Sequence, residues 1–298
     1  MKMTLGTLLE EGKEKLEKAG VPDPLLDARF LLLDVFDMNF ASFLVKRDRP
    51  LTETENGTNI TEADTDTRKK IDKYWELISK REMRIPFQQL TGVQEFMGLE
   101  FYVNEHVLIP RQDTETLVEL ILNEHKEKNI SLLDVCTGSG CIAVSLAKLG
   151  GYADVTALDL SEEALKVAKS NGEKLLDHPV KFIKSDMFSA LDPENRYDVI
   201  VSNPPYIPSQ VIEGLEPEVK DHEPRMALDG EPDGLKFYRI LAEEGKKYLK
   251  NGGEIYMEIG WDQAKDVTEI FEAMGFSGLR TVRDMAGNDR VVCARKEK

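Results

Sequence analysis

The chain has 298 residues, the composition of an ordinary globular protein and a formal net charge of −16 at pH 7. It has no run of eighteen apolar residues and no apolar signal core at its amino terminus, so we expect a cytoplasmic protein without a membrane span. The part from residue 86 onward holds −14 of the net charge, which disfavours binding along duplex nucleic acid, where affinity comes mainly from neutralised phosphates.

Apolar side chains in the first 85 residues recur at helical spacing and predict a small helical bundle. A polar, nearly aromatic-free stretch over residues 52–67 interrupts this spacing, and we expect it to be a flexible loop. Asp23 precedes Pro24 and is expected to cap the second helix. The stretches with helical spacing are residues 4–19, 25–33, 39–46 and 67–84.

Pro86 ends this bundle, and residues 88–103 alternate as β-strands do, which predicts one or two short hairpins. An amphipathic helix follows, for which Asp113 or Thr114 is the expected cap. We therefore divide the chain into a helical bundle of residues 1–85, a β-hairpin bridge of residues 86–110 and a larger domain of residues 111–298.

A glycine-containing turn follows the first buried strand of the larger domain. Four of the six residues 130–135 are apolar, which predicts a buried strand, and Gly138 and Gly140 lie between this strand and the next helix. A strand that turns through glycines into a helix lets the backbone approach a ligand closely. The second strand ends at Asp159, 19 residues beyond Gly140, where a carboxylate can accept both hydroxyls of a ribose. The turn alone is a weak signal, because nucleotide, flavin and nicotinamide proteins share it.

The rest of the larger domain alternates helices and strands, which predicts an open α/β sheet. Asp186 follows a strand and can hydrogen-bond an adenine amino group, with Met187 or Phe188 packed on the ring; core packing explains Phe188 at least as well. Only a Gly-Asn turn separates the last two strands, so the sheet should end in an antiparallel pair. These strands are expected over residues 279–284 and 290–294.

The apolar run of residues 199–202 ends abruptly at Asn203-Pro204-Pro205-Tyr206, which predicts a buried strand followed by a rigid turn. The side-chain carbonyl of Asn203 and the main-chain carbonyl of Pro204 can converge on one planar NH2 group. Acceptors aimed at the positive charge that develops on such a nitrogen lower the barrier to its reaction with an electrophilic carbon. The motif contains no Ser, Cys or His nucleophile, so it favours transfer to an amide or exocyclic amine over hydrolysis.

Residues 207–233 form an unusually long segment without helical or strand periodicity, rich in Pro and Glu. A long irregular segment at the active end of a sheet is more often a lid or a substrate clamp than a passive connection.

Taken together, these motifs closely resemble the PrmC/HemK family over essentially the whole chain. Members of that family use S-adenosylmethionine to methylate the side-chain nitrogen of the glutamine in the Gly-Gly-Gln motif of peptide chain release factors. The resemblance implies a class I (Rossmann-like) methyltransferase domain, a bundle that recognises the substrate, release factors as partners and no metal. The matching segments are residues 84–87, 108–111, 134–140, 159, 186, 203–206, 227–230 and 232–235.

The resemblance also implies roles for single residues. Asp159 would hold the cofactor's ribose, and Asn203 with Pro204 would receive the glutamine amide, in a pocket lined by Pro205 and Tyr206. The resemblance also counts Asn203 among the cofactor-binding residues. The other expected cofactor-binding residues are Cys136, Thr137, Gly138, Ser139, Gly140, Asp186 and Met187, of which Thr137 to Gly140 would line the methionine portion.

Two of these positions depart from the commonest family pattern. Cys136 stands where a glycine is frequent, and Met187 stands where an aromatic residue often packs near the adenine.

Three other readings stay open. The Asn-Pro-Pro-Tyr motif also occurs in adenine-N6 and guanine-N2 methyltransferases, so the acceptor could be an exocyclic amine in nucleic acid, or a glutamine in a ribosomal protein. The glycine turn would also suit a nicotinamide-dependent oxidoreductase, but no His or acid for a hydride site is evident near Asn203. A non-catalytic binding module would keep the fold and tolerate loss of Asn203.

Overall fold

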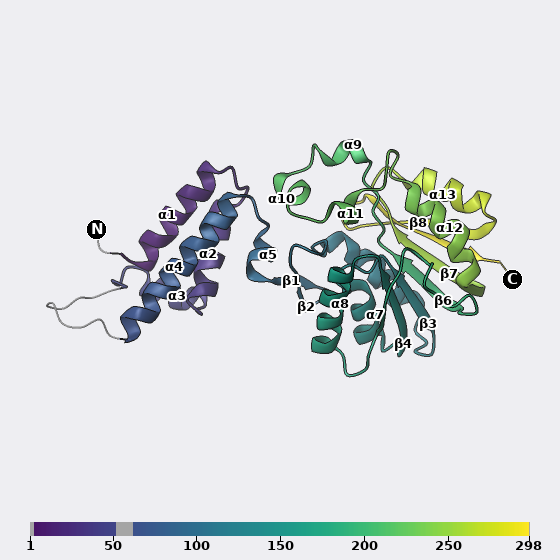
Figure 1. Cartoon of the computed structure of the whole chain (residues 1–298), viewed down its shortest axis with the longest axis horizontal. Helices are drawn as coiled ribbons and strands as arrows, with labels where there is room; N and C mark the ends of the chain where they lie inside the picture. Colours follow the sequence, from purple (N-terminus) through teal and green to yellow (C-terminus); the bar gives the residue numbers. More distant parts are fainter. Residues whose placement is uncertain (1–2, 52–61, 298) are drawn as a thin grey trace. The chain divides into compact units, whose positions relative to one another are not determined.

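The computed structural model describes residues 3–51 and 62–297 (Figure 1). The chain divides into two compact units, Met1–Thr91 and Gly92–Lys298. The boundary falls inside the segment that the sequence suggests as a bridge, residues 86–110.

The amino-terminal unit is helical. Thr4 caps the first helix by a reciprocal side-chain exchange with Thr7, and Arg81 of the fourth helix forms an ion pair of 2.7 Å with Asp27 of the second. Asp23 is the N-cap residue of the second helix and Pro24 lies in its first turn, as predicted, but the Asp23 side chain makes no cap hydrogen bond. The helices are α1 (Leu5–Lys18), α2 (Pro24–Val35), α3 (Phe40–Lys46), α4 (Glu62–Glu82) and α5 (Phe87–Thr91).

Helix α4 starts earlier than its apolar spacing suggested. It begins at Glu62, so the carboxyl-terminal part of the predicted loop of residues 52–67 is helical. Residues 52–61 of that loop lie outside the described part of the chain.

The larger unit opens with a hairpin of β1 (Val93–Phe96) and β2 (Leu99–Tyr102), which pair antiparallel. Strands and helices then alternate as the sequence predicts. They are η1 (Gln112–Thr114), α6 (Glu115–Glu124), β3 (Ser131–Val135), α7 (Cys141–Gly150), β4 (Asp154–Asp159), α8 (Glu162–Leu175), β5 (Lys181–Lys184), β6 (Tyr197–Ser202), α9 (Ser209–Ile212), α10 (Pro217–Lys220), α11 (Arg225–Leu228), α12 (Lys236–Tyr248), β7 (Leu249–Glu258), α13 (Ala264–Ala273), β8 (Phe276–Arg283) and β9 (Asp289–Lys296).

The main sheet has seven strands in the order β5-β4-β3-β6-β7-β9-β8. Strands β3 to β7 are parallel, and β9 runs antiparallel to both β7 and β8, which confirms the predicted closing pair. The chain leaves β3 toward β4 and β5, then returns to place β6 on the other side of β3. Ligands of open α/β sheets bind where the strand order reverses in this way, at the carboxyl ends of the central strands.

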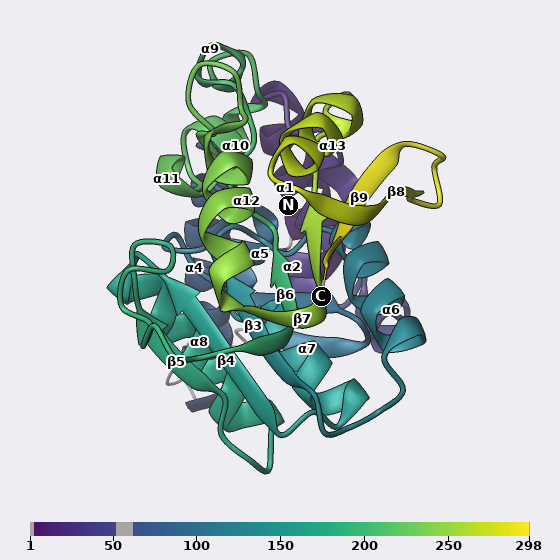
Figure 2. The same cartoon turned by 90° about the vertical axis from the view of Figure 1, so that its right-hand side faces the viewer.

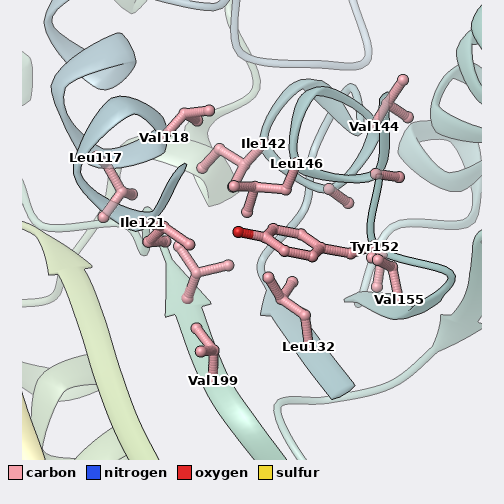
Figure 3. Packing of buried hydrophobic residues seen from close by; sticks show 14 of the residues in the cluster. Leu117, Val118, Ile121, Leu132, Ile142, Val144, Leu146, Tyr152, Val155 and Val199 are labelled. Carbon is pink, nitrogen blue, oxygen red and sulfur yellow. The ribbon is translucent and has the colours of Figure 1, made fainter. Parts of the chain in front are cut away.

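Helices cover both faces of this sheet, in three layers (Figure 2). On one face, apolar residues of α6 and α7 pack on alternate residues of β3, β4 and β6, with the Tyr152 ring among them (Figure 3). On the other face, α12 and α13 pack on the intervening residues of the same strands. The register pairs Leu132 with Val199 and Leu133 with Ile200, so both central strands contribute to both cores. A strand buried on both faces reads as a continuous apolar run, which is why the sequence identified these strands well.

Residues 207–233 contain more helical structure than the sequence suggested. The segment contains the short helices α9, α10 and α11, and each begins at or directly after a proline: Pro208, Pro217 and Pro224. Proline suits the start of a helix because its missing N–H would have no intrahelical partner there.

None of the helices in residues 3–51 and 62–297 is long and apolar enough to cross a membrane.

Candidate active site

A cavity of about 420 Å³ lies at the carboxyl ends of the central strands. Most of the residues expected from the sequence line it, together with residues 224–227, Asp229 and Glu231. Gly140, Pro204 and Tyr206 are not among the lining residues. The expected residues that do line the cavity are Cys136, Thr137, Gly138, Ser139, Asp159, Asp186, Met187, Asn203 and Pro205.

The two glycines of the turn after β3 have different environments. Both have positive φ, 56° at Gly138 and 80° at Gly140. A Cβ at Gly138 would meet no atom within 4 Å, so the cavity is open there. A Cβ at Gly140 would lie 3.1 Å from the Cβ of Ala168, so this glycine allows α7 and α8 to pack closely.

Asp159, at the end of β4, holds the glycine turn in place. Its Oδ2 accepts a hydrogen bond from the Gly138 N–H at 2.8 Å, and its Oδ1 accepts one from the Ser161 N–H at 2.8 Å. Burial raises the pKa of Asp159, and these main-chain donors partly offset that effect. Each carboxylate oxygen has a second lone pair, so Asp159 can still accept two further donors such as the hydroxyls of a ribose.

Cys136 and Met187, the two residues that depart from the family pattern, contact each other. The Cys136 Sγ lies 3.9 Å from the Met187 Sδ, and both side chains line the cavity. Both residues have positive φ, 64° and 48°. A positive φ is the conformation that glycine adopts most easily, which explains in physical terms why a glycine suits position 136.

Asp134 belongs to β3, just before the glycine turn, and is fully buried. Its Oδ2 accepts a hydrogen bond from the Thr137 hydroxyl at 2.5 Å, and its Oδ1 has no partner among the described residues. Burial raises the pKa of Asp134 to about 7, and the nearby charge of Asp159 adds to that rise.

Replacing Asp134 with asparagine should therefore change how stability depends on pH. An unfolded aspartate titrates near pH 4. From about pH 4 to 7 the folded chain keeps a proton that the unfolded chain has lost, so stability from this group falls as pH rises through that window. The Asp134→Asn variant has no titratable group at this position, so its unfolding free energy minus that of the wild type should increase over the same window. Urea unfolding at several pH values measures this difference, and a constant difference would contradict the raised pKa.

Asn203 follows β6 with its amide oriented by a single partner. Its Nδ2 donates to the Thr114 hydroxyl at 3.4 Å, and its Oδ1 accepts no hydrogen bond from any described residue. Of the two expected cap residues, Asp113 and Thr114, it is Thr114 that occupies the N-cap position of α6, but its side chain makes no cap hydrogen bond. The arrangement leaves an acceptor oxygen for a ligand NH2 group beside the cavity.

The other end of the turn is fixed from β7 and the loop after it. The Tyr206 hydroxyl donates to the Glu258 Oε1 at 3.2 Å, and the Gln263 Nε2 donates to the Tyr206 carbonyl at 3.0 Å. Burial raises the pKa of Tyr206, and the neighbouring charge of Glu258 raises it further, so the phenol stays protonated. These two hydrogen bonds therefore hold Tyr206, the last residue of the turn, in place.

The segment that follows the turn, from Ile207 to Gly234, folds back and contacts the turn. The Ile207 N–H donates to the Leu228 carbonyl at 3.0 Å, and the Gly230 N–H donates to the Ile207 carbonyl at 2.9 Å. A Cβ at Gly230 would lie 2.9 Å from the Tyr206 Cα, and one at Gly234 would collide with the Tyr206 carbonyl oxygen. Both glycines are therefore required by close approach to the turn.

Replacing Gly234 with alanine should displace the turn and lower both stability and turnover. The position combines a φ of 72° with the collision against Tyr206. Gly252 is a matched control, because it has a φ of 81° and no atom within 4 Å of a Cβ. Gly252→Ala should cost only the backbone strain, about 1 kcal/mol, and Gly234→Ala about 1–3 kcal/mol more. Thermal unfolding and single-turnover rates compare the two; equal losses would show that Gly234 does not support the turn.

Arg111 connects the cavity wall to the segment after the turn. It lines the cavity, and its guanidinium forms an ion pair of 2.7 Å with Glu223, whose side chain is buried. Burial raises the pKa of Glu223, and Arg111 opposes that rise. The pair anchors residues 207–233 against the residues that precede η1.

Sequence reasoning missed Thr114, Glu258 and Gln263 as parts of the site. Only Glu258 left a usable signal, since a charged residue at the carboxyl end of a buried strand lies at the ligand-binding edge of an α/β sheet.

Comparisons with known proteins find relatives along nearly the whole chain. Residues 126–288 match the family model of a methyltransferase domain, and residues 7–58 match that of the PrmC N-terminal domain. The chain is 40% identical over 294 residues to the release factor glutamine methyltransferase of Fusobacterium nucleatum, covering 97% of this chain and 78% of that protein. It is 39% identical over 297 residues to that of Clostridium botulinum, covering 99% and 100%. A solved 16S rRNA methyltransferase of T. thermophilus, in complex with AdoMet and guanosine, has a TM-score of 0.50 at 18% identity over 69% of this chain and 50% of that chain, which shows a shared fold.

Proposed function

Because the chain belongs to the release factor glutamine methyltransferase family, we propose that it methylates the glutamine of the Gly-Gly-Gln motif in a peptide chain release factor. The methyl group would come from S-adenosylmethionine and go to the side-chain amide nitrogen. The larger unit has the class I (Rossmann-like) methyltransferase fold. The observation that carries the proposal is the Asn203 Oδ1, which is left without a protein partner among the described residues, beside a cavity at the reversal point of the sheet. Because its proposed substrate acts in translation, we propose that the reaction takes place in the cytoplasm.

The residues around the cavity fit S-adenosylmethionine. Asp159 offers free lone pairs for the ribose, the space above Gly138 is open, and the buried Ser139 hydroxyl has no partner among the described residues. Asp186 and Met187 would lie at the adenine, with Cys136 packed against Met187. The bound cofactor would supply an electrophilic methyl group on a sulfonium centre.

The chain's own residues then act on the glutamine amide. The Asn203 Oδ1 and the Pro204 carbonyl would accept its two N–H bonds, which holds the nitrogen in one orientation and stabilises the positive charge that develops on it. The Asn203 Nδ2 donates to the Thr114 hydroxyl, so the Asn203 Oδ1, and not the Nδ2, would face the substrate amide. The surplus proton of the methylated amide can leave to water, so no strong base is required.

A second candidate is methylation of another planar amine, either a glutamine of a ribosomal protein or an adenine or guanine amine. The acidic charge of the larger unit disfavours nucleic acid, and the named relatives favour a release factor.

The proposal is tested by incubating the protein with methyl-labelled S-adenosylmethionine beside four acceptors: a class I release factor, isolated ribosomal proteins, duplex DNA and ribosomal RNA. We expect label on the release factor. Label only on nucleic acid or on a ribosomal protein would identify that molecule, and not the release factor, as the substrate. Cofactor binding without methyl transfer to any of the four acceptors would favour a non-catalytic binding module.

A further inference from the structure

Asn171 of α8 is a fully buried polar residue that is not among those lining the cavity. It lies three residues beyond Ala168, whose Cβ would be 3.1 Å from a Cβ at Gly140. Residues three apart on a helix share one face, so Asn171 lies on the face of α8 that packs on the glycine turn after β3. Burying an amide costs stability unless its donors and acceptor are paired, so the partners of Asn171 show what it holds.

The Asn171 amide bonds to the main chain of two segments that are distant in the sequence. Its Oδ1 accepts a hydrogen bond from the Tyr102 N–H at 2.7 Å. Its Nδ2 donates to the Tyr102 carbonyl at 3.0 Å and to the Ser139 carbonyl at 2.9 Å, which uses both of its N–H bonds. Asn171 therefore joins the β1–β2 hairpin to the glycine turn.

On the hairpin side, Asn171 takes the place of a third strand. The Val103 N–H donates to the Gly92 carbonyl, so the neighbouring pair of the ladder, Val93 and Tyr102, turns its main-chain groups outward. Asn171 pairs with both outward groups of Tyr102. The chain continues from there into residues 106–111, most of which line the cavity. Asn171 thus anchors the start of one cavity wall.

On the other side, Asn171 fixes the peptide group between Ser139 and Gly140. The Gly140 N–H donates to the Thr137 carbonyl at 2.9 Å, and the Ser139 carbonyl accepts from Asn171. Gly140 has a φ of 80°, and a peptide next to glycine rotates easily unless both of its polar groups are held. Ser139 itself lines the cavity, so this peptide belongs to the opposite wall.

We propose that Asn171 is a positioning residue of the cofactor site, which fixes the glycine turn relative to the segment of residues 106–111. It does so through main-chain hydrogen bonds at Ser139 and Tyr102. The inference rests on the proposed function, because it takes S-adenosylmethionine as the ligand between these two walls. It implies that a bound cofactor stabilises the β1–β2 hairpin, although none of residues 93–102 lines the cavity.

The first test needs no substitution. Hydrogen exchange of the peptide covering residues 93–103 is followed by mass spectrometry, with and without saturating S-adenosylmethionine. A peptide covering β8 is the reference, because β8 is also an edge strand and none of its residues lines the cavity. We expect the cofactor to slow exchange of the hairpin more than that of β8, since the ligand stabilises the turn to which the hairpin is bonded. Equal slowing of both peptides would overturn the inference.

The second test compares Asn171→Ala with Ser131→Ala. Asn171→Ala removes all three bonds and should weaken the affinity for S-adenosylmethionine about 10-fold or more, with kcat at saturating cofactor within about threefold. Ser131 is a matched control, because it is buried and its hydroxyl bonds to Arg196 and Asp198 at the amino end of β3, opposite the cavity. Ser131→Ala should lower the melting temperature but keep the Kd of the cofactor within about twofold of the wild type.

The outcomes separate this inference from the proposed function. Cofactor binding by a wild type that does not methylate the release factor would overturn the proposed substrate alone, because exchange and affinity need no acceptor. A wild type that does not bind S-adenosylmethionine would overturn both. A loss of affinity in Asn171→Ala no larger than that in Ser131→Ala would overturn the inference alone. If Asn171→Ala does not fold, the exchange experiment on the wild type decides.

Discussion

Replacing Asn203 with alanine should lower the rate of methyl transfer about 100-fold or more while leaving the affinity for S-adenosylmethionine within about threefold. The Asn203 side chain would accept an N–H bond of the amide, and this acceptor matters most when positive charge develops on the nitrogen. Its only hydrogen bond within the described residues runs from its Nδ2 to Thr114, so the alanine variant loses little structural support. Single-turnover rates and calorimetric titration of the cofactor measure the two quantities.

Asn123→Ala is a suitable control, because Asn123 is exposed on α6, far along the chain from the turn. It should leave both quantities unchanged. A parallel loss of rate and cofactor affinity in Asn203→Ala would count against a role of Asn203 in the chemical step.

Replacing Asp159 with alanine should weaken the affinity for S-adenosylmethionine about 10- to 100-fold and change kcat at saturating cofactor much less. This is the reverse of the effect expected for Asn203→Ala. The variant loses the acceptors for the ribose, and it also frees the Gly138 and Ser161 N–H groups that the carboxylate now holds. Asp159→Asn keeps the shape and one oxygen, so its loss should be smaller. Titration of S-adenosylmethionine measures the series, and unchanged affinity in Asp159→Ala would remove the ribose assignment.

The main features of the fold could be predicted from local patterns. Strands β3, β4 and β6 are buried on both faces and stand out as apolar runs, and the Gly-Asn turn predicted the antiparallel pair of β8 and β9. Of the predicted residues, Asp159 ends β4 and Asn203 directly follows β6, and the carboxyl ends of parallel strands share one edge of the sheet. The structure accordingly brings both to one cavity.

The supporting side chains could not be predicted, because their partners are distant in sequence. Glu258 is 52 residues from Tyr206, and Thr114 is 89 residues from Asn203. Periodicity specifies which face of an element is buried but not which polar side chains meet across elements. The backbone conformation of Cys136 could not be predicted for a different reason, since its positive φ is visible only in the folded backbone.

The central claim is that this chain methylates one particular glutamine nitrogen. The most direct test is to treat a release factor with the protein and S-adenosylmethionine, digest it and locate the added methyl group by tandem mass spectrometry. A release factor whose Gly-Gly-Gln glutamine is changed to alanine serves as the matched substrate. We predict one methyl group on the side-chain nitrogen of that glutamine and none on the altered factor. A methyl group on another residue, or equal methylation of both factors, would contradict the account.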